Sequence, residues 1–571
     1  MSRFRARAAA ATFVAAGLAW TLHGRAQDAR QALQITEIGN PAIEQPGLIF
    51  SESRVPWTPQ ARTARDSSAS ALRKGTSGRQ YATGKVLVRF RDEVAVDERR
   101  AMARDASSTA DLMPRRAYAD FDLVRIDPSE NAEAVAAALA RRPQVVYAQA
   151  AYRMHPTFVP NDPRYSDQWN LRLVNMEKAW DIQPQAGSSI TVAVIDTGMA
   201  YLTRTITANI PGFINGGVRY PPLGVRTIPY AAAPDLVGSN ASRIVAPFDV
   251  ISNGLNPPLD FEGHGTHVSG TVGQLTNDAI GVAGVAFNVK LMPVKALGGE
   301  WDVLFGLQPF VGGTDDDVAT AIRYAADNGA QIINMSLGSS GPSNCASAPM
   351  QPGCSPAVES ALRYAVCTGS KSSTCSGKGA FVAVAGGNEF EDFDPDFGSN
   401  PTSVLAEIAN RIKGVVSVAA VDPNRNRAWY SSTGNYIELA APGGSNRGFS
   451  GGSGFVFQET FDFNFTDTFD PTVVPPSRYG PPRFDVLAPI GYIGTSQATP
   501  HVSGIAAMLR QQGITDPAAI EDALEKLADP LGSAATDECP VGVTAPAGRT
   551  CSFGFGLVNA RNALRGLGLA R

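Results

Sequence analysis

The chain has 571 residues, of which 44% are hydrophobic, so it is long enough for more than one folding unit and for a large packed core. Its 49 Lys and Arg residues nearly balance its 53 Asp and Glu residues, and the formal net charge is −4. Proteins that hold phosphate backbones usually carry a basic surplus, so this balance argues against nucleic acid as a partner.

The N-terminus has the pattern of an export signal. Three arginines within the first seven residues precede a mostly apolar run over residues 8–22, and Ala26 offers a small residue for cleavage. The run is short for a membrane span, which needs about 20 apolar residues. We therefore expect a signal peptide over residues 1–26, secretion to the extracellular space or the periplasm, and no membrane association after cleavage. An uncleaved N-terminal anchor is the alternative.

A leader and a small domain are expected next. Residues 27–80 are rich in Ala, Arg, Ser, Gln and Pro without sustained periodicity, which favours a disordered leader or linker. Residues 81–155 alternate β-prone and Ala-rich stretches, in the order typical of a small α+β sandwich. The expected elements are strands at 85–90, 121–126 and 145–150 and helices at 96–105 and 130–142.

The third and largest block, residues 156–571, alternates buried apolar runs with helices. One run, residues 190–195, ends directly at Asp196. This alternation predicts an α/β domain whose mostly parallel sheet is covered by helices on both faces, with the chemistry at the carboxyl ends of the strands. Further strands are expected at 289–295, 331–335, 380–384 and 415–418, and a helix at 318–328.

The six cysteines are consistent with export, because an oxidising compartment permits disulfides. Six cysteines allow fifteen pairings. We expect sequential pairing because each such pair closes a short loop, and the spacings do not suggest a metal site. The predicted disulfides are Cys345–Cys354, Cys367–Cys375 and Cys539–Cys551.

Three short motifs carry the residue types that nucleophilic catalysis needs. They are Val-Ile-Asp-Thr-Gly around Asp196, Gly-His-Gly-Thr-His around His264, and Gly-Thr-Ser-Gln-Ala-Thr-Pro around Ser496. Each motif alone has an ordinary structural explanation. Asp196 could be a turn or cap residue, His264 could belong to a metal site or a helix cap, and Ser496 could be a plain N-cap. Together they are far more specific.

A neutral serine is a weak nucleophile that needs a base to take its proton, and the base needs a carboxylate to fix its tautomer. Asp196, His264 and Ser496 supply these three roles. Ser496 precedes an expected helix, whose free first-turn amides and dipole favour the negative charge that acyl transfer develops.

The three motifs resemble those of the subtilisin-like serine peptidases, in which the triad follows the same Asp, His, Ser order. The similarity extends through most of residues 161–565 and implies a subtilisin-like catalytic domain over 156–571. The region 81–155 resembles the family's ferredoxin-like inhibitory propeptide. The resemblance implies a secreted serine endopeptidase that forms an acyl-enzyme and cuts its own precursor between residues 155 and 161. We expect a monomer that acts on proteins or peptides.

Further residues follow from the resemblance. Gly386-Gly387-Asn388 matches the segment whose Asn donates a hydrogen bond to the oxyanion, although an ordinary Gly-Asn turn is the alternative. An extended substrate is expected along residues 336–338 and 312–313. Acidic residues that follow Asn388 favour basic substrate side chains, or are solvated, or bind a cation.

Structural calcium is also implied. Residues 275–282 resemble the family's calcium loop, with Asp278 where a side-chain ligand is expected, and Asp162 lies in a segment that resembles another ligand source. Calcium takes several oxygen ligands. Residues 199–203 depart from the family, because they lack the acidic residue usually found after the catalytic Asp.

Three stretches look like insertions: residues 202–258, 341–376 and 449–484. Two other functions stay open at the level of sequence. One is a peptide ligase or cyclase on the same fold, and the other is a secreted binding protein on a degenerate protease scaffold. The complete triad argues against the second.

Overall fold

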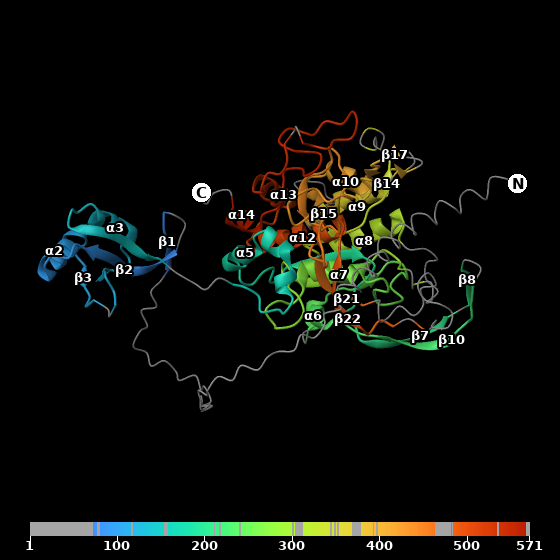
Figure 1. The fold of residues 1–571 in the computed structure, drawn as a ribbon, viewed down its shortest axis with the longest axis horizontal. Helices are drawn as coiled ribbons and strands as arrows, with labels where there is room; N and C mark the ends of the chain where they lie inside the picture. The colour runs from blue at the N-terminus through green and yellow to red at the C-terminus, as the bar shows by residue number, and fades with distance from the viewer. Residues whose placement is uncertain are drawn as a thin grey trace, which may run out of the picture. The chain divides into compact units, whose positions relative to one another are not determined.

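The computed structural model describes residues 72–566 apart from short gaps, the longest of which are 303–311, 368–378 and 463–480. The chain divides into two compact units that adjoin in sequence between Pro156 and Thr157 (Figure 1). Each unit has a hydrophobic core of its own. The expected signal peptide at 1–26 and most of the expected leader at 27–80 fall outside the described residues.

The small unit is an antiparallel sheet with helices on one face. The sheet order β5-β2-β4-β3, combined with the chain order strand-helix-strand-strand-helix-strand, is the ferredoxin-like arrangement that we expected. The short strand β3 was not predicted from the sequence, and β1 lies in the segment assigned to the leader. The elements are β1 (Leu72–Lys74), β2 (Gln80–Phe90), α2 (Val96–Ala106), β3 (Asp111–Leu112), β4 (Asp122–Arg125), α3 (Ala132–Ala140) and β5 (Val145–Tyr152).

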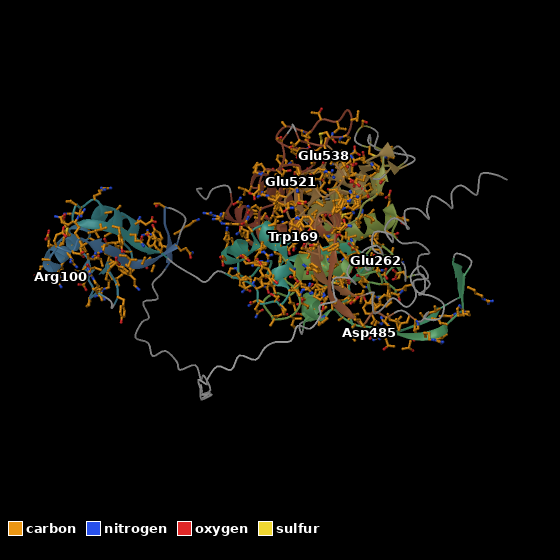
Figure 2. All side chains as sticks on the ribbon, viewed as in Figure 1. Arg100, Trp169, Glu262, Asp485, Glu521 and Glu538 are labelled. Carbon is orange, nitrogen blue, oxygen red and sulfur yellow. A yellow bond between two sulfur atoms is a disulfide. The ribbon has the colours of Figure 1, made fainter. Side chains whose placement is uncertain are left out.

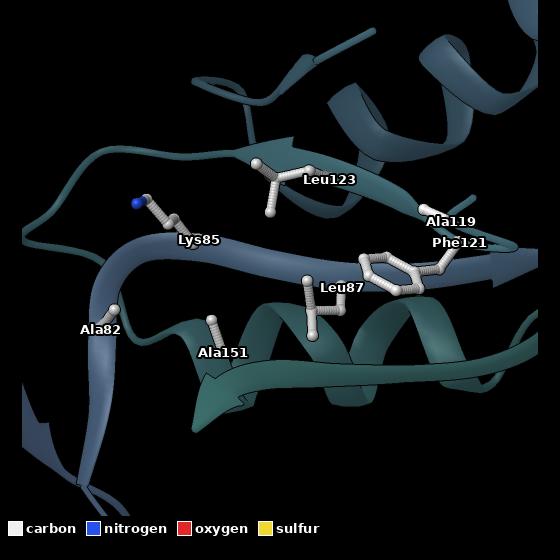
Figure 3. A pocket seen from close by; sticks show the side chains of 7 residues that line it. All are labelled: Ala82, Lys85, Leu87, Ala119, Phe121, Leu123 and Ala151. Carbon is white, nitrogen blue, oxygen red and sulfur yellow. The ribbon is translucent and has the colours of Figure 1, made fainter. Parts of the chain in front are cut away.

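The two faces of this small sheet differ. Along β2, buried residues such as Val86 and Val88 alternate with half-buried ones, as the two-residue period of a strand requires. The buried set packs into the core of the unit. On the opposite face, Leu87, Phe121 and Leu123 border an open cavity of about 330 Å³ (Figure 3). The small unit therefore presents an apolar sheet face.

The large unit is built on a seven-stranded parallel sheet in the order β11-β12-β6-β13-β15-β19-β20. The five strands predicted from sequence are confirmed, whereas β11 and β20 were missed. The strands are β6 (Thr191–Asp196), β11 (Phe248–Asp249), β12 (Lys290–Lys295), β13 (Ile332–Met335), β15 (Phe381–Ala385), β19 (Val415–Val421) and β20 (Leu439–Pro442).

Helices cover both faces of this sheet, as predicted. In β6, Val192 and Val194 belong to one core, and Ala193 and Ile195 belong to the other. The first core contains α7 (His264–Gly273) and α12 (Thr495–Gln511), and the second contains α8 (Asp315–Asp327) and α9 (Pro356–Val366). The other helices and short strands are α4 (Trp169–Leu173), α5 (Met176–Ile182), α6 (Pro234–Val237), α10 (Val404–Ala409), α13 (Pro517–Lys526), α14 (Ala560–Arg565), β14 (Ser340–Gly341), β16 (Phe393–Asp394), β17 (Gly398–Ser399) and β18 (Thr402–Ser403).

Two of the expected insertions form β-hairpins. In the stretch 202–258, β7 (Arg204–Ile210) pairs antiparallel with β10 (Gly224–Tyr230), and the small hairpin of β8 (Phe213–Asn215) and β9 (Val218–Tyr220) lies beyond them. This ribbon extends from the body of the large unit (Figure 1). In the stretch 449–484, β21 (Val456–Phe461) pairs with β22 (Leu487–Tyr492), which lies just beyond the predicted end of the insertion.

Two of the predicted disulfides, Cys345–Cys354 and Cys539–Cys551, are present. Cys367 is also disulfide-bonded, and Cys375, its expected partner, lies outside the described residues. Within residues 72–566, we find no helix with the length and apolar character to span a bilayer.

Candidate active site

The three predicted triad residues lie on three neighbouring elements of the large unit. Asp196 is the last residue of β6, His264 is the first residue of α7, and Ser496 lies in the first turn of α12. Helix α12 packs against α7 and β6. The sheet edge at the carboxyl end of β6 therefore gathers the motifs, as the α/β architecture predicts.

Helix α7 starts close to the end of β6 because of Gly265. Its amide donates to Thr197 Oγ1 at 2.9 Å, and a Cβ atom at this position would clash with the backbone carbonyl of Gly198. A glycine lets the two backbones approach closely. This contact holds His264 beside Asp196.

Asp196 and His264 form the central interaction of the site. His264 Nδ1 lies 2.8 Å from Asp196 Oδ1, which also accepts the Thr197 amide at 2.7 Å. The carboxylate is fully buried, whereas the imidazole is 23% exposed. Burial by itself lowers the pKa of His264. The charge and hydrogen bond of Asp196, together with the charge of Glu262, outweigh burial and raise that pKa to about 9.

Two further carboxylates in this loop were missed by the sequence analysis. Asp260 is buried and accepts hydrogen bonds from the amides of Gly263 and Thr266 and from the Thr266 hydroxyl, so it caps the start of α7. Glu262, labelled in Figure 2, lies in the large unit. It accepts the His264 amide at 2.8 Å, and burial raises its pKa to about 7. Asp260 lies ahead of the N-cap Gly263, so the usual capping signal in a sequence does not identify it.

Ser496 is anchored to the neighbouring loop. Its hydroxyl donates to the Ser336 carbonyl at 3.1 Å, and the Ser336 hydroxyl donates to the Ser496 carbonyl at 2.8 Å. No hydrogen bond joins Ser496 Oγ to His264, both of which are described residues. Such contacts are often long in an unliganded protease and shorten when substrate binds. Residues 336–338, which we expected along the substrate cleft, therefore begin beside Ser496.

Asn388 is held next to Ser496 through Thr495. Its side-chain oxygen accepts the Thr495 amide at 2.8 Å and the Thr495 hydroxyl at 2.9 Å. Because the oxygen is occupied in this way, the Nδ2 group is the donor left on this exposed side chain. The Asn388 side chain is therefore fixed beside the start of α12, where the Ser496 amide also lies, with its Nδ2 donor unused by these hydrogen bonds.

Asp162 and Asp278 both contact the loop of residues 275–282. Asp162 accepts the Asn277 amide at 2.8 Å, and Asp278 accepts the Ile280 amide at 3.0 Å. Burial raises the pKa of Asp162. Among the described residues, neither carboxylate belongs to a cluster of three metal-binding side chains.

The insertion at 202–258 brings a carboxylate to this loop that the sequence analysis missed. Asp235 accepts the Val282 amide through Oδ2 at 2.9 Å, while its Oδ1 is buried without a hydrogen bond. Burial raises the pKa of Asp235 to about 8. A buried carboxylate oxygen without a partner, beside a loop rich in backbone oxygens, is suited to a hard cation such as calcium. No sequence pattern marked Asp235, because it lies in an insertion.

A second acidic group lies elsewhere in the large unit. Glu438, Glu521 and Glu525 are buried and their carboxylates gather within 4.8 Å of one another. Lys413 forms an ion pair with Glu521, and Arg549 lies 3.6 Å from Glu438. The protein itself therefore supplies positive charge to this cluster.

Comparison with known proteins finds matches to both units of the chain. The family model described as Subtilase family matches residues 187–556, and the fervidolysin N-terminal prodomain matches residues 67–150. The thermophilic serine proteinase of Bacillus sp. (strain AK1) is 28% identical over 485 residues, which cover 85% of this chain and 88% of that protein. The extracellular protease of Xanthomonas campestris pv. campestris is 30% identical over 451 residues, which cover 75% of this chain and 63% of that protein.

Among solved structures, a protease from Pseudoalteromonas arctica matches with 28% identity and a TM-score of 0.46, covering 71% of this chain and 99% of its own. Fervidolysin from Fervidobacterium pennivorans matches with 21% identity and a TM-score of 0.45, covering 87% and 62%. The subtilase match alone spans more than half of the chain. The chain is therefore a member of the subtilase family of serine proteases and carries an N-terminal prodomain.

Proposed function

We propose that this subtilase is a secreted serine endopeptidase with Asp196, His264 and Ser496 as its catalytic triad. The observation that carries the proposal is the 2.8 Å hydrogen bond between His264 Nδ1 and the buried Asp196, at the sheet edge where α12 brings Ser496. Secretion is supported by the signal-like N-terminus and by relatives that are named extracellular proteases.

In this mechanism, Ser496 Oγ attacks the carbonyl carbon of a peptide bond while His264 Nε2 accepts the hydroxyl proton. The hydroxyl first rotates away from the Ser336 carbonyl. Asp196 keeps Nδ1 protonated and stabilises the imidazolium. His264 then protonates the leaving amine, an acyl-enzyme remains on Ser496, and water releases it by the same proton transfers.

Asn388 Nδ2 and the Ser496 amide are proposed to stabilise the oxyanion. The two hydrogen bonds from Thr495 fix the orientation of the Asn388 amide before substrate arrives. Preorganised donors act where charge develops in the transition state. Loss of one such donor costs about 10²–10³-fold in kcat in a well-studied subtilisin, and we expect Asn388→Ala to act in the same direction here.

The prodomain is proposed to act as an intramolecular inhibitor until the precursor cuts itself between residues 155 and 161. The apolar sheet face around Leu87 and Leu123 is the surface that we assign to this inhibition (Figure 3). A solvent-exposed apolar patch on a small domain marks an interaction site.

A structural calcium ion is also proposed. Asp235, with Asp162 or Asp278, would hold it together with backbone carbonyls of residues 275–282, and it would crosslink the insertion to this loop. It takes no part in the proposed chemistry. Its expected effect is on stability.

The test compares the secreted wild type with Ser496→Ala by mass spectrometry, with casein present in each sample. The wild type should lose its N-terminal segments and digest casein, whereas the variant should remain a precursor. Loss of a triad residue lowers kcat by about 10⁶-fold in a characterised relative. Normal autoprocessing in the variant would contradict the assignment, and labelling of Ser496 by a fluorophosphonate would support it independently.

A further inference from the structure

The ribbon of residues 204–230, which we name the basic arm, is an addition to the large unit. Strands β7 and β10 pair along their whole length, from Arg204 opposite Tyr230 to Ile210 opposite Gly224. Ala208, Ile210 and Ile228 are buried, so the inner side of the arm is packed. Figure 1 shows that the ribbon reaches out from the body of the unit.

The arm is positively charged, whereas the chain as a whole is negatively charged. Residues 197–234 contain three arginines, Arg204, Arg219 and Arg226, and no Asp, Glu or Lys, while the whole chain has a formal net charge of −4. All three arginines are exposed. None of them forms an ion pair with a described residue, whereas most other arginines of the large unit do so or are buried or stacked. The three positive charges are therefore available to a partner.

The arginines are spread along the arm. Arg204 lies at its base opposite Tyr230, Arg226 lies midway opposite Ala208, and Arg219 lies in the outer hairpin opposite Ile214. A chain that follows the arm would meet one positive charge after another. This distribution suits an extended anionic polymer better than a compact ion.

The base of the arm is joined to the loop that carries His264. The Tyr230 hydroxyl donates to the Asp260 carbonyl at 2.9 Å and accepts the Asp260 amide at 3.0 Å. The Tyr230 ring contacts Phe261 and Phe461. Because Asp260 caps α7, the base of the arm is joined to the start of the helix that begins with His264.

The arm also has the backbone geometry to bind polypeptide. It is a two-stranded sheet, and apart from a bridge between Tyr230 and Phe484 its outer edges have no strand partner among the described residues. A free strand edge offers N–H and C=O groups that an extended peptide can pair with. The side of the arm that carries Thr205, Thr207 and Asn209 is exposed and polar apart from the exposed Val225. Arg204 and Arg226 alternate with these residues and extend from the edges of the other side.

We propose that the basic arm is an exosite that binds acidic segments of polypeptide substrates and delivers them to the cleft. This inference rests on the proposed endopeptidase function and adds a substrate class to it. Charge complementarity of this kind raises the rate of productive encounter by about 10–10³-fold and weakens as salt increases.

The experiment uses the mature full enzyme and two peptides with one shared cleavage sequence, taken from the casein digest. One peptide has a flanking extension that alternates Asp and Ser, and the other has an uncharged Gly-Ser extension of equal length. The arm variant changes Arg204, Arg219 and Arg226 to Ser. The matched control removes the same charge from exposed sites on α5, β12 and α8, by changing Lys178, Lys290 and Arg323 to Ser.

We expect the wild type and the control to show a higher kcat/KM on the acidic peptide than on the neutral one at low salt, by about tenfold. In the arm variant, kcat/KM on the acidic peptide should fall to its value on the neutral peptide, and kcat/KM on the neutral peptide should stay at the wild-type value. High salt should abolish the ratio in the wild type. Cleavage of the neutral peptide by the wild type tests the proposed function, and only the ratio tests the arm.

An unchanged ratio in the arm variant, or an equal loss of ratio in the control, would overturn the proposal. A sulfated polysaccharide that binds the wild type but not the arm variant, without any preference for the acidic peptide, would assign the arm to polysaccharide and overturn it as well.

Discussion

His264 is surrounded by carboxylates, and this determines the pH at which it can act as a base. Burial disfavours its charged form, but Asp196, Glu262 and Asp260 together outweigh burial and raise its pKa to about 9. A base must be neutral to accept the Ser496 proton. The proposed triad is therefore active only as His264 loses its proton on the alkaline side of neutrality.

The first prediction concerns this pH dependence. The kcat/KM of the wild type should rise with pH through the pKa of His264 and level off above it. In Glu262→Gln, one negative charge near the imidazole is removed, so His264 should lose its proton more easily and the rise should move to lower pH. The measurement is kcat/KM on a neutral peptide between pH 6 and 11.

Glu538→Gln is the matched control, because Glu538 pairs with Arg427 and lies on another part of the large unit (Figure 2). Its profile should coincide with that of the wild type. A Glu262→Gln profile that also coincides would show that Glu262 does not act on His264.

At the scale of elements, a buried ion pair supports the sheet edge at Asp196. Lys295 at the end of β12 is the register partner of Asp196, donates to the Thr197 carbonyl, and lies 3.0 Å from Asp302. Both side chains of the pair are almost fully buried. Removal of one partner leaves an uncompensated buried charge.

The second prediction is that Lys295→Met, in the inactive Ser496→Ala precursor, destabilises the protein by about 3–5 kcal/mol, whereas the double change Lys295→Met with Asp302→Asn costs clearly less. Chemical denaturation followed by circular dichroism measures both. Equal losses of unfolding free energy in the single and the double variant would show that Lys295 and Asp302 are not coupled.

The proposed calcium site belongs to the same scale, because Asp235 connects the 202–258 insertion to the loop of residues 275–282. The third prediction is that chelation lowers the melting temperature of the wild type but not of Asp235→Asn. Calcium at 100 times its dissociation constant stabilises by about 2.7 kcal/mol. Asp485→Asn, in an exposed ion pair with Arg483, should behave like the wild type.

The titration of Asp235 determines how the stabilisation by calcium changes with pH. Its pKa of about 8 means that the calcium-free protein keeps this carboxyl protonated at neutral pH. A cation must displace that proton, so the calcium-dependent rise in melting temperature should grow between pH 6 and 9. A rise that shrinks with pH would exclude Asp235 as a ligand.

At the scale of the whole molecule, two units with separate cores lie in one precursor, and the small one exposes an apolar sheet face. The fourth prediction is that Leu87→Ser with Leu123→Ser weakens inhibition, so that precursor preparations gain proteolytic activity sooner than the wild type. These side chains face away from the core of the small unit, so its fold should survive.

Active-site titration during processing measures this effect, and circular dichroism of the Ser496→Ala precursor checks the fold. Arg104→Ser, an exposed change on α2, which packs on the opposite face of the sheet, serves as the control and should activate at the wild-type rate. Unchanged activation in the Leu variant would show that inhibition uses another surface.

The sequence by itself determined the local features of this protein. The apolar runs of five parallel strands, the alternation with helices and the three motifs are readable without coordinates, because periodicity and short-range chemistry are written along the chain. The short loops between cysteines also predicted the disulfides Cys345–Cys354 and Cys539–Cys551, whereas Asn388 was named only through the family resemblance. The missed strands β3 and β11 have two residues each, too few to show a period, and the hairpin strands β7, β10, β21 and β22 were also missed.

Tertiary structure decided what depends on contacts between distant segments. The pKa of His264 depends on charges that the loop before α7 brings around it, and Asp235 reaches the calcium loop only because the insertion folds back. Contacts between separate segments also form the buried ion pair of Lys295 and Asp302 and attach the basic arm to Asp260. Burial and proximity are properties of the packed chain, and no local pattern of residues encodes them.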